Sequence, residues 1–154
     1  MSEGSSELLD ELDLRILRAL SEDARRSCRE VAEKLQVASG TVYNRIKRMM
    51  DKGVIEGYIP LVDPAKLGYD LTTLILAQVD HKQLLEIEER LVKLEYVNAI
   101  YDITGEFDIA LIARVKDRET LNDLVKKILH IPGVNRTVTN VVFDVVKEDF
   151  RVKI

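Results

Sequence analysis

Tyr43, Asn44 and Lys47 lie on one side of a segment whose other side is apolar. The apolar positions of this segment follow helical spacing and are Val42, Ile46 and Met49. A helix with this spacing buries its apolar side, so the three polar side chains face outward. Amide, phenol and ammonium groups bind base edges and phosphates, and the major groove of DNA accepts one helix. The segment is therefore predicted to be a DNA-reading helix.

A second helix is predicted immediately before this one, over Cys28–Leu35. Its apolar residues Val31, Ala32 and Leu35 recur at helical spacing. The hydroxyl of Ser27 can cap the first amides. Two short helices joined by a tight turn, with the second one basic, indicate a helix-turn-helix. The candidate DNA-contacting residues are Ser39, Gly40, Thr41, Tyr43, Asn44, Arg45, Lys47 and Arg48.

Charge is distributed unevenly along the chain, whose formal net charge is -4. Residues 24–52 hold eight basic and three acidic side chains, whereas residues 1–23 hold two basic and seven acidic ones. This polarity can orient a module on DNA. A charge run is also the ordinary solvated face of a helix, and that interpretation is favoured for Arg25, Arg26 and Lys34 taken singly.

Arg45 borders the buried stripe of the DNA-reading helix, so two roles stay open for it. Its guanidinium can contact a DNA phosphate, or it can pair with an acidic residue of the first helix.

The composition allows a well-packed core. A chain of 154 residues, 46% hydrophobic and 32% charged, suffices for one domain or two small ones. Residues 1–6 lack the apolar stretch of a secretory signal, and no run approaches membrane-spanning length. The single Cys28 excludes an intramolecular disulfide and a cysteine-based metal site, and the expected location is a reducing cytoplasm.

The chain divides into four predicted parts. A helix over Glu7–Leu20 is expected to brace the two-helix reader. Residues 54–62 favour an extended connector or edge strand, because Gly57 and Pro60 interrupt a run of β-formers. Residues 63–67 favour one helical turn. The parts are a flexible N-terminus at 1–6, a helix-turn-helix (winged-helix-like) domain at 7–53, a hinge strand and linker at 54–68, and a second domain at 69–154.

Residues 69–154 alternate strand and helix patterns in two similar rounds. Strands are predicted over 71–79, 97–104, 108–115 and 134–146, with helices over 84–94 and 119–129. Two βαβ units of this kind close into a ferredoxin-like βαββαβ sandwich. The predicted fold class is α+β, with an N-terminal helix-turn-helix domain joined by a hinge strand to this sandwich.

The third predicted strand of the sandwich is apolar on both sides. Ile109 and Leu111 point one way, and Ala110 and Ile112 point the other. Since both helices are expected on one face of the sheet, the other face is predicted to bind a partner subunit. The alternative is that long loops or the C-terminal tail shield it.

Four groups of residues, each weak alone, stand in a specific order and spacing. They are Leu12-Asp13-Leu14-Arg15-Ile16-Leu17 with Asp23-Ala24-Arg25, Val31-Ala32, Arg45-Ile46 with Gly53-Val54-Ile55-Glu56-Gly57-Tyr58, and Thr104-Gly105-Glu106-Phe107-Asp108 before Pro132-Gly133-Val134. Together they resemble the Lrp/AsnC family of transcriptional regulators over nearly the whole chain.

The chain departs from the family pattern in and after the turn. Gln36 stands where a glycine is usual, and Ala38 stands where a capping serine is usual. Ser39 can cap instead, which moves the start of the DNA-reading helix by one residue. Met49 and Met50 replace the usual Leu-Glu, which is a change of packing.

The resemblance implies that residues 69–154 bind an effector, form oligomers and respond to an amino acid. By the same resemblance, a pocket between subunits is lined by Thr104, Gly105, Asp108, Thr137 and Thr139. The chemistry suits an amino acid, since Gly105 lets backbone amides approach a carboxylate and Asp108 can hold an ammonium group. Without the resemblance, the same glycine and aspartate are typical of a tight β-turn.

The predicted function is sequence-specific DNA binding by a transcriptional regulator whose assembly and DNA binding respond to an amino acid. The predicted partners are double-stranded DNA, the amino acid and further copies of the chain, as a homodimer and a tetramer or octamer, with no membrane and no cofactor. One rival is an architectural DNA-binding protein with little sequence preference and no effector. Another is a metabolite sensor whose basic helix contacts protein. DNA titrations separate these hypotheses.

Neither an enzyme nor a metal site is predicted. His81 and His130 lie in different connections, and Cys28 has no histidine near it in the sequence. No phosphate-binding glycine loop is present. Acidic residues near one hairpin are more often solvated or paired than bound to metal. Here these residues are Asp102, Glu106 and Asp108.

Overall fold

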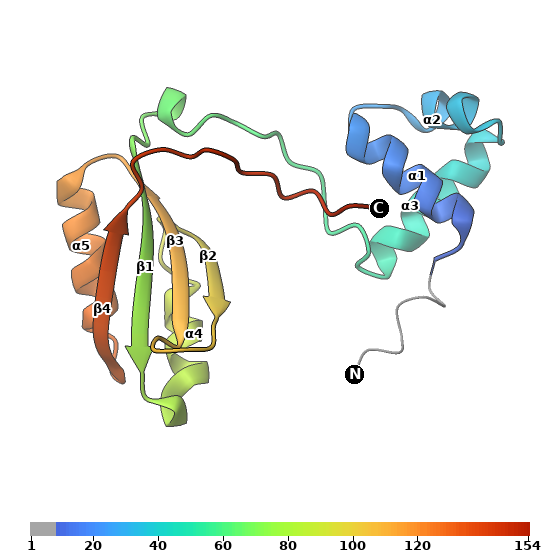
Figure 1. Ribbon diagram of the computed structural model, residues 1–154. Helices are drawn as coiled ribbons and strands as arrows, with labels where there is room; N and C mark the ends of the chain where they lie inside the picture. The colour runs from blue at the N-terminus through green and yellow to red at the C-terminus, as the bar shows by residue number, and fades with distance from the viewer. Residues whose placement is uncertain (1–8) are drawn as a thin grey trace. The chain divides into compact units, whose positions relative to one another are not determined.

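The computed structural model describes residues 9–154, which form two compact units. The first contains the described residues up to Leu61 together with Asp149–Ile154, and the second contains Val62–Glu148. Figure 1 labels the helices of the first unit and the strands and helices of the second. The predicted flexible segment 1–6 and the predicted helix start at Glu7 lie outside the described residues.

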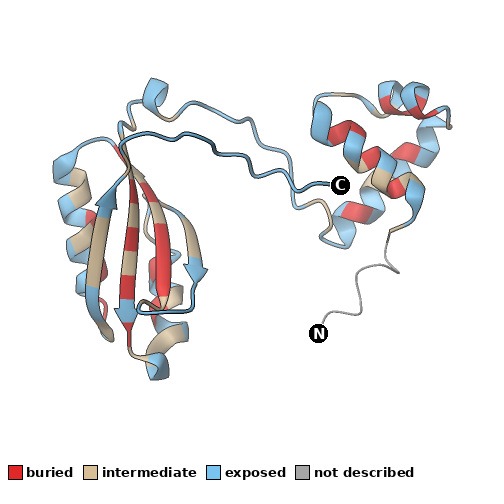
Figure 2. Cartoon of the chain, viewed as in Figure 1, coloured by how far each residue is buried: buried red, intermediate tan, exposed pale blue. Residues whose placement is uncertain are grey.

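Three helices pack around one core in the first unit. They are α1 Glu11–Glu22, α2 Cys28–Leu35 and α3 Ser39–Asp51. The inward stripe predicted for α3 is confirmed, since Val42 and Met49 are buried and Ile46 packs against the same core. Buried positions recur along all three helices in Figure 2. Near the end of the chain, Arg18 Nε of α1 donates to the carbonyl of Ile154 at 3.3 Å.

Capping residues set where the first two helices begin. At α1, Asp10 and Asp13 form a reciprocal capping box, so the helix begins at Glu11. At α2, the predicted cap is confirmed: Ser27 and Glu30 form a second capping box.

The turn into α3 differs from the family pattern in two ways. Gln36 has a φ of 57°, in the left-handed region that glycine adopts at least cost. Ala38 is the N-cap residue of α3 and makes no side-chain cap hydrogen bond. The predicted capping by Ser39 is therefore wrong, because Ser39 is already the first helical residue.

The connector after α3 belongs to no helix or sheet. Residues 54–62 form neither helix nor strand, so the hinge strand predicted there is not observed within the described chain. A strand needs a neighbour to complete its hydrogen-bond ladder, and Pro60 has no N–H to contribute. Ile59 and Leu61 are each 82% exposed. The predicted single turn follows at Ala65–Leu67.

The second unit is a four-stranded antiparallel sheet with two helices. Its elements are β1 Leu71–Val79, a short 3₁₀ turn His81–Gln83, α4 Leu84–Leu91, β2 Val97–Asp102, β3 Ile109–Val115, α5 Arg118–Leu129 and β4 Val134–Val141. This order confirms the predicted βαββαβ sequence, and the strands lie in the order β2-β3-β1-β4.

The last strand is shorter than predicted. β4 ends at Val141, opposite Thr73 of β1, and not at Val146, because the pairing of the two strands does not continue further. The N–H of Val142 makes the final bond, to the carbonyl of Thr72 at 2.9 Å.

The two faces of the sheet differ in cover. Helices α4 and α5 lie on one side of it (Figure 1), where Ile75 and Leu111 are fully buried. On the other side, Leu74, Leu76 and Ile112 are partly exposed. This second side is the uncovered apolar face that the strand pattern predicts. No helix in residues 9–154 is long and apolar enough to cross a membrane.

Candidate DNA-binding surface and effector loop

Most of the predicted DNA-contacting residues lie on the outward side of α3. The exposed ones are Ser39, Gly40, Thr41, Tyr43, Asn44, Lys47 and Arg48, whereas Arg45 is partly buried. The aromatic Tyr43 is 58% exposed, so most of its ring is free for a partner outside the unit. Helical geometry thus brings donors, a ring and one ammonium group together opposite the buried stripe.

The first amides of α3 have no side-chain cap. The N–H groups of Thr41 and Val42 donate to the carbonyl of Ala38, at 3.0 and 3.3 Å. The amides of Ser39 and Gly40 precede these first helical donors, and no side chain caps them. Such amides, at the positive end of the helix dipole, suit a phosphate oxygen.

Arg45 and Arg48, two further predicted DNA contacts, are engaged inside the unit. Arg45 Nη1 donates to the Asp10 carboxylate and to Asp13 Oδ1 at 3.1 Å, and Arg48 Nη2 donates to Asp13 Oδ2. Of the two roles open to Arg45, the structure shows the ion pair with the first helix. The hydrogen bond from Arg45 holds the pKa of Asp10 at about 2, and the same carboxylate raises the pKa of Arg45.

Other basic residues of the first unit are also paired. Arg26 and Lys34 both reach Glu22, and their hydrogen bonds lower the pKa of that carboxyl. Further pairs join Arg25 to Asp23 and Arg29 to Glu33. Within the described residues of 24–52, no ion pair involves Lys47 or Lys52. The basic excess in the sequence therefore overstates the positive charge that is free for DNA.

The predicted effector residues Thr104, Gly105 and Asp108 share the loop between β2 and β3. The N–H of Ile103 donates to the carbonyl of Asp108 at 2.8 Å and closes the loop. Gly105 has a φ of 124°, which side chains rarely allow. The connection is thus a short closed loop, in which Thr104 and Gly105 are exposed.

Asp108 joins this loop to the end of β1. The N–H of Val79 donates to Asp108 Oδ2 at 2.8 Å, and the N–H of Asp108 donates to the carbonyl of Ala77 at 3.0 Å. The other carboxylate oxygen, Oδ1, lies 3.2 Å from Nε2 of His81, whose side chain is 78% exposed. Sequence reasoning missed both contacts, because Val79 and His81 are distant in the chain and carry no motif.

Thr137 and Thr139 lie apart from the loop. They pair across the sheet with Ala77 and Ile75, which are core residues under the helices. Paired residues share a face, so both threonines lie on the helix-covered side. The strand β1 separates them from β3, which begins just after Asp108.

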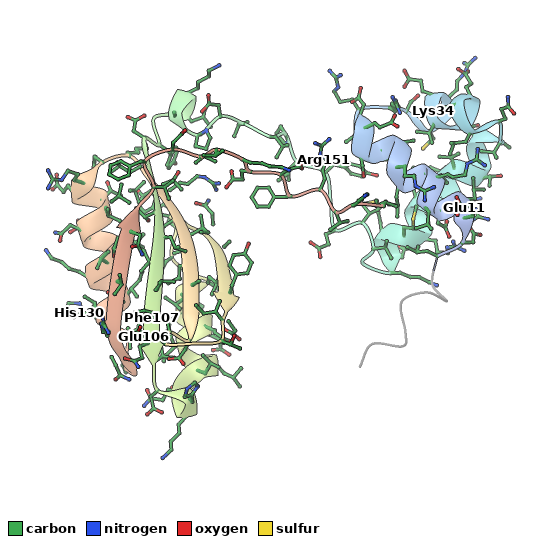
Figure 3. The ribbon with its side chains drawn as sticks, in the orientation of Figure 1. Glu11, Lys34, Glu106, Phe107, His130 and Arg151 are labelled. Atoms are coloured by element: carbon green, nitrogen blue, oxygen red, sulfur yellow. The ribbon has the colours of Figure 1, made fainter. Side chains whose placement is uncertain are left out.

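Arg136, which was not among the predicted residues, contacts the loop directly. Its Nη1 lies 3.2 Å from Oε1 of Glu106, and its guanidinium carbon lies 5.4 Å from the ring centre of Phe107. Figure 3 labels Glu106 and Phe107 at the end of the sheet where the loop lies. Because Arg136 is about 30 residues from this loop in the sequence, spacing does not reveal either contact.

A pair of carboxyl groups lies at the end of β2. Burial raises the pKa of Glu88 on α4, and the nearby carboxyl of Asp102 raises it further. The Glu88 Oε1 atom is buried without a hydrogen-bond partner in the described chain. No group of three or more His, Cys, Asp or Glu side chains in residues 9–154 could hold a metal ion.

Comparison with known proteins assigns both units. Residues 9–56 match the winged helix-turn-helix DNA-binding family, and residues 72–152 match the Lrp/AsnC ligand binding domain. The second match covers more than half of the chain. The chain belongs to the Lrp/AsnC family. The Lrp/AsnC resemblance and the α+β fold with an N-terminal helix-turn-helix, both expected from the sequence, are thus confirmed.

This Lrp/AsnC chain has relatives along nearly its whole length. It is 46% identical over 145 residues to an HTH-type transcriptional regulator of Pyrococcus furiosus, which covers 94% of this chain and 98% of the relative. The structure of Escherichia coli AsnC matches with a TM-score of 0.82 and 28% identity, over 94% of this chain and 97% of that one. A Neisseria meningitidis regulator solved as a complex with L-Met matches with a TM-score of 0.86 and 23% identity, over 94% and 96%.

These matches settle the broad function of the Lrp/AsnC chain. It is a transcriptional regulator with a DNA-binding helix-turn-helix and a ligand-binding domain. Its relatives are transcriptional regulators and not enzymes, which confirms the prediction that the chain is not an enzyme.

Proposed function

We propose that this Lrp/AsnC regulator binds specific DNA sequences through α3 and alters that binding when an amino acid occupies its second unit. One observation carries the DNA half of the proposal: Tyr43, Asn44 and Lys47 are exposed together, opposite a buried stripe. The amides at the start of α3, at Ser39 and Gly40, would fix the helix on phosphates. The amide and phenol groups would read base edges.

Self-association supports the same proposal. The uncovered sheet face carries Leu74, Leu76 and Ile112, and a second copy of the chain would bury it. In a dimer, two copies of α3 would enter successive major grooves about 34 Å apart on one side of the DNA. Tetramers or octamers would extend this arrangement along the duplex. A regulator of this kind acts where the chromosome lies, which is why we propose a cytoplasmic location.

The amino-acid effector is proposed to bind the loop at Thr104, Gly105 and Asp108. Only Oδ2 of Asp108 is held by the backbone, whereas Oδ1 faces the exposed side chain of His81. A ligand ammonium group can therefore replace the imidazole at Oδ1 without breaking the bond from Val79. The Neisseria regulator of the same fold was solved with L-Met, which supports an amino acid as the ligand class.

Two threonines of β4 are also proposed to contact the effector, from the helix-covered side of the sheet. Thr137 and Thr139 offer hydroxyl groups there and are partly buried. Arg136, also on β4 but on the opposite face of the sheet, contacts the loop at Glu106 and offers a guanidinium to a ligand carboxylate. The ligand can shift DNA binding only if it binds one assembly state better than another.

The test is a DNA titration with substitutions on α3. Genomic fragments selected by the purified protein are compared with scrambled duplex by fluorescence anisotropy, at two salt concentrations, with and without pooled amino acids. A preference of about 10³-fold or more for the selected site is expected of a regulator. Absence of any preference would instead favour an architectural DNA-binding protein.

Substitutions then locate the surface. Tyr43→Ala and Lys47→Ala are expected to weaken binding, and Lys47→Ala is expected to lower the salt slope by about one if its ammonium meets a phosphate. Lys126→Ala, an exposed lysine of α5, is the matched control and should leave binding unchanged. Unchanged affinity in both α3 variants would place the DNA surface elsewhere.

A further inference from the structure

Asp13 is a charged residue with no exposed surface. Its side chain is 0% exposed, in a helix whose other buried positions are apolar. Each carboxylate oxygen is used: Oδ1 accepts from Arg45, and Oδ2 accepts from Arg48 and from the N–H of Asp10 at 3.0 Å. A buried carboxylate is retained only where its partners satisfy it, so this cluster holds α1 and α3 in one fixed arrangement.

The two arginines lie between the buried stripe of α3 and its outward side. At 100° per residue, Arg45 and Arg48 occupy neighbouring positions on the flank that faces α1. Asn44 and Lys47 are directed further from the core. The ion pairs to Asp13 therefore draw two positive charges away from the side that would meet DNA.

We propose that Asp13 is a positioning residue for DNA reading, which fixes α3 through Arg45 and Arg48 and keeps both arginines from binding phosphates. This rests on the proposed reading of DNA by α3. Phosphate contacts raise the affinity for every sequence equally and carry no base information. Withholding two cations therefore lowers the affinity for all DNA alike, whereas the fixed helix keeps its base contacts in register and so favours the selected site. The cluster thus increases sequence preference.

The arginines remain with Asp13 when DNA approaches, because leaving a buried carboxylate unpaired is strongly unfavourable. The exposed pairs behave differently. In Arg25–Asp23 and Arg29–Glu33, the arginine side chains are 91% and 85% exposed, so those arginines can exchange carboxylate for phosphate at little cost. Arg45 and Arg48 are themselves 24% and 43% exposed, so it is the burial of their partner Asp13 that separates them from arginines that are free to bind DNA.

The first test is Asp13→Asn, which keeps the size of the side chain and removes its charge. The asparagine side chain has one oxygen that can accept and one NH₂ group that can only donate. The NH₂ group faces an arginine N–H, which is also a donor, so at least one guanidinium is released. Binding to scrambled duplex is expected to tighten about tenfold at low salt, with the salt slope steeper by about one. The preference for the selected site is expected to fall about tenfold.

The matched control is Glu22→Gln, which changes the net charge equally but releases Arg26 and Lys34, both outside α3. It should leave the site preference unchanged. A merely structural role of Asp13 would weaken binding to all DNA and would not steepen the salt slope. Weaker binding to scrambled duplex by a folded Asp13→Asn protein, or an unchanged preference, overturns the proposal.

Arg48→Gln keeps the proposal testable if Asp13→Asn does not fold. The expected result is an unchanged salt slope with a preference reduced about fivefold, because no phosphate contact is lost. A slope lower by about one, with the preference intact, would mean that Arg48 binds phosphate and would overturn the proposal. If the parent protein prefers no sequence, the proposed function fails as well, whereas failure of the variants alone affects only Asp13.

Discussion

The two units each contain an aspartate that joins distant parts of the chain, but the partners differ. In the helical unit, Asp13 is fully buried and both oxygens accept from arginine side chains of α3. In the sheet unit, Asp108 is 17% exposed and has one oxygen held by the N–H of Val79, while the other faces the exposed imidazole of His81.

This difference separates a structural charge from a binding group. Fixed cations neutralise Asp13 in the absence of any ligand, so the residue has nothing left to bind. Asp108 keeps one oxygen whose neighbour can move into solvent. The same residue type therefore serves stability and position in one unit and offers a ligand contact in the other.

The largest expected effect is on the free energy of unfolding, when the carboxylates of Asp13 and Asp108 are each removed. Asp13→Ala leaves two arginines without their buried partner and should lower the free energy of unfolding by about 3 kcal/mol. Asp108→Ala loses the acceptor for the N–H of Val79 and should cost about 1 kcal/mol. Urea unfolding followed by circular dichroism measures both. Equal losses in the two variants would contradict the comparison.

The second prediction concerns ligand binding alone. Asp108→Asn keeps an acceptor for the Val79 N–H and removes the charge that would hold an ammonium group. The amino-acid effect on DNA affinity should fall about tenfold or more, since the charged hydrogen bond is lost, while DNA binding without the amino acid stays unchanged. Anisotropy titrations with the pooled amino acids measure this. His81→Ala serves as the control, because the effector should displace its side chain, and the response should remain.

The third prediction tests the strained turn of the helical unit. Gln36 adopts a left-handed backbone conformation, so Gln36→Gly should raise the stability by about 1 kcal/mol. The gain appears as a higher melting temperature in calorimetry. Gln83→Gly, at a residue with a φ of -112°, is the control and should not stabilise the protein. No gain at Gln36 would mean that its side chain makes a contribution that offsets the strain.

The smallest effect concerns Glu88 of the sheet unit. Its pKa is raised by burial and by Asp102, so the protonated form is favoured in the folded state. The stability that this group provides is therefore present below pH 4.5 and is lost as the pH rises through its raised pKa. Glu88→Gln should raise the melting temperature at pH 7 and leave it unchanged at pH 4. A lower melting temperature at pH 7 would show that the ionised form is stabilised by contacts other than these.

Local patterns in the sequence predict the elements of both units. The apolar stripe of α3, the cap at Ser27 and the βαββαβ order follow from helical and strand periodicity, which depends on neighbouring residues. The end of β4 is harder to predict, because it depends on how far the pairing with β1 extends. The hinge strand predicted at 54–62 would need a neighbouring strand to pair with, and the described residues of the single chain do not supply one.

The candidate sites depend on contacts between residues far apart in the sequence. A basic stretch does not reveal that Arg45 and Arg48 pair with acids 32 or more residues earlier. The sequence likewise gives no sign that Arg136 reaches Glu106 across the sheet. Residue types predicted the chemistry of each surface, whereas the fold decides which charges remain free. The positions that contact DNA and the effector remain predictions.

One titration tests the central comparison most directly. The parent, Asp13→Asn and Asp108→Asn proteins are titrated with selected and scrambled duplex, with and without amino acids. The account predicts a crossed result: Asp13→Asn loses sequence preference and keeps the amino-acid response, while Asp108→Asn keeps the preference and loses the response. Loss of both properties in both variants, or the reverse pattern, would contradict the separate roles assigned to the two aspartates.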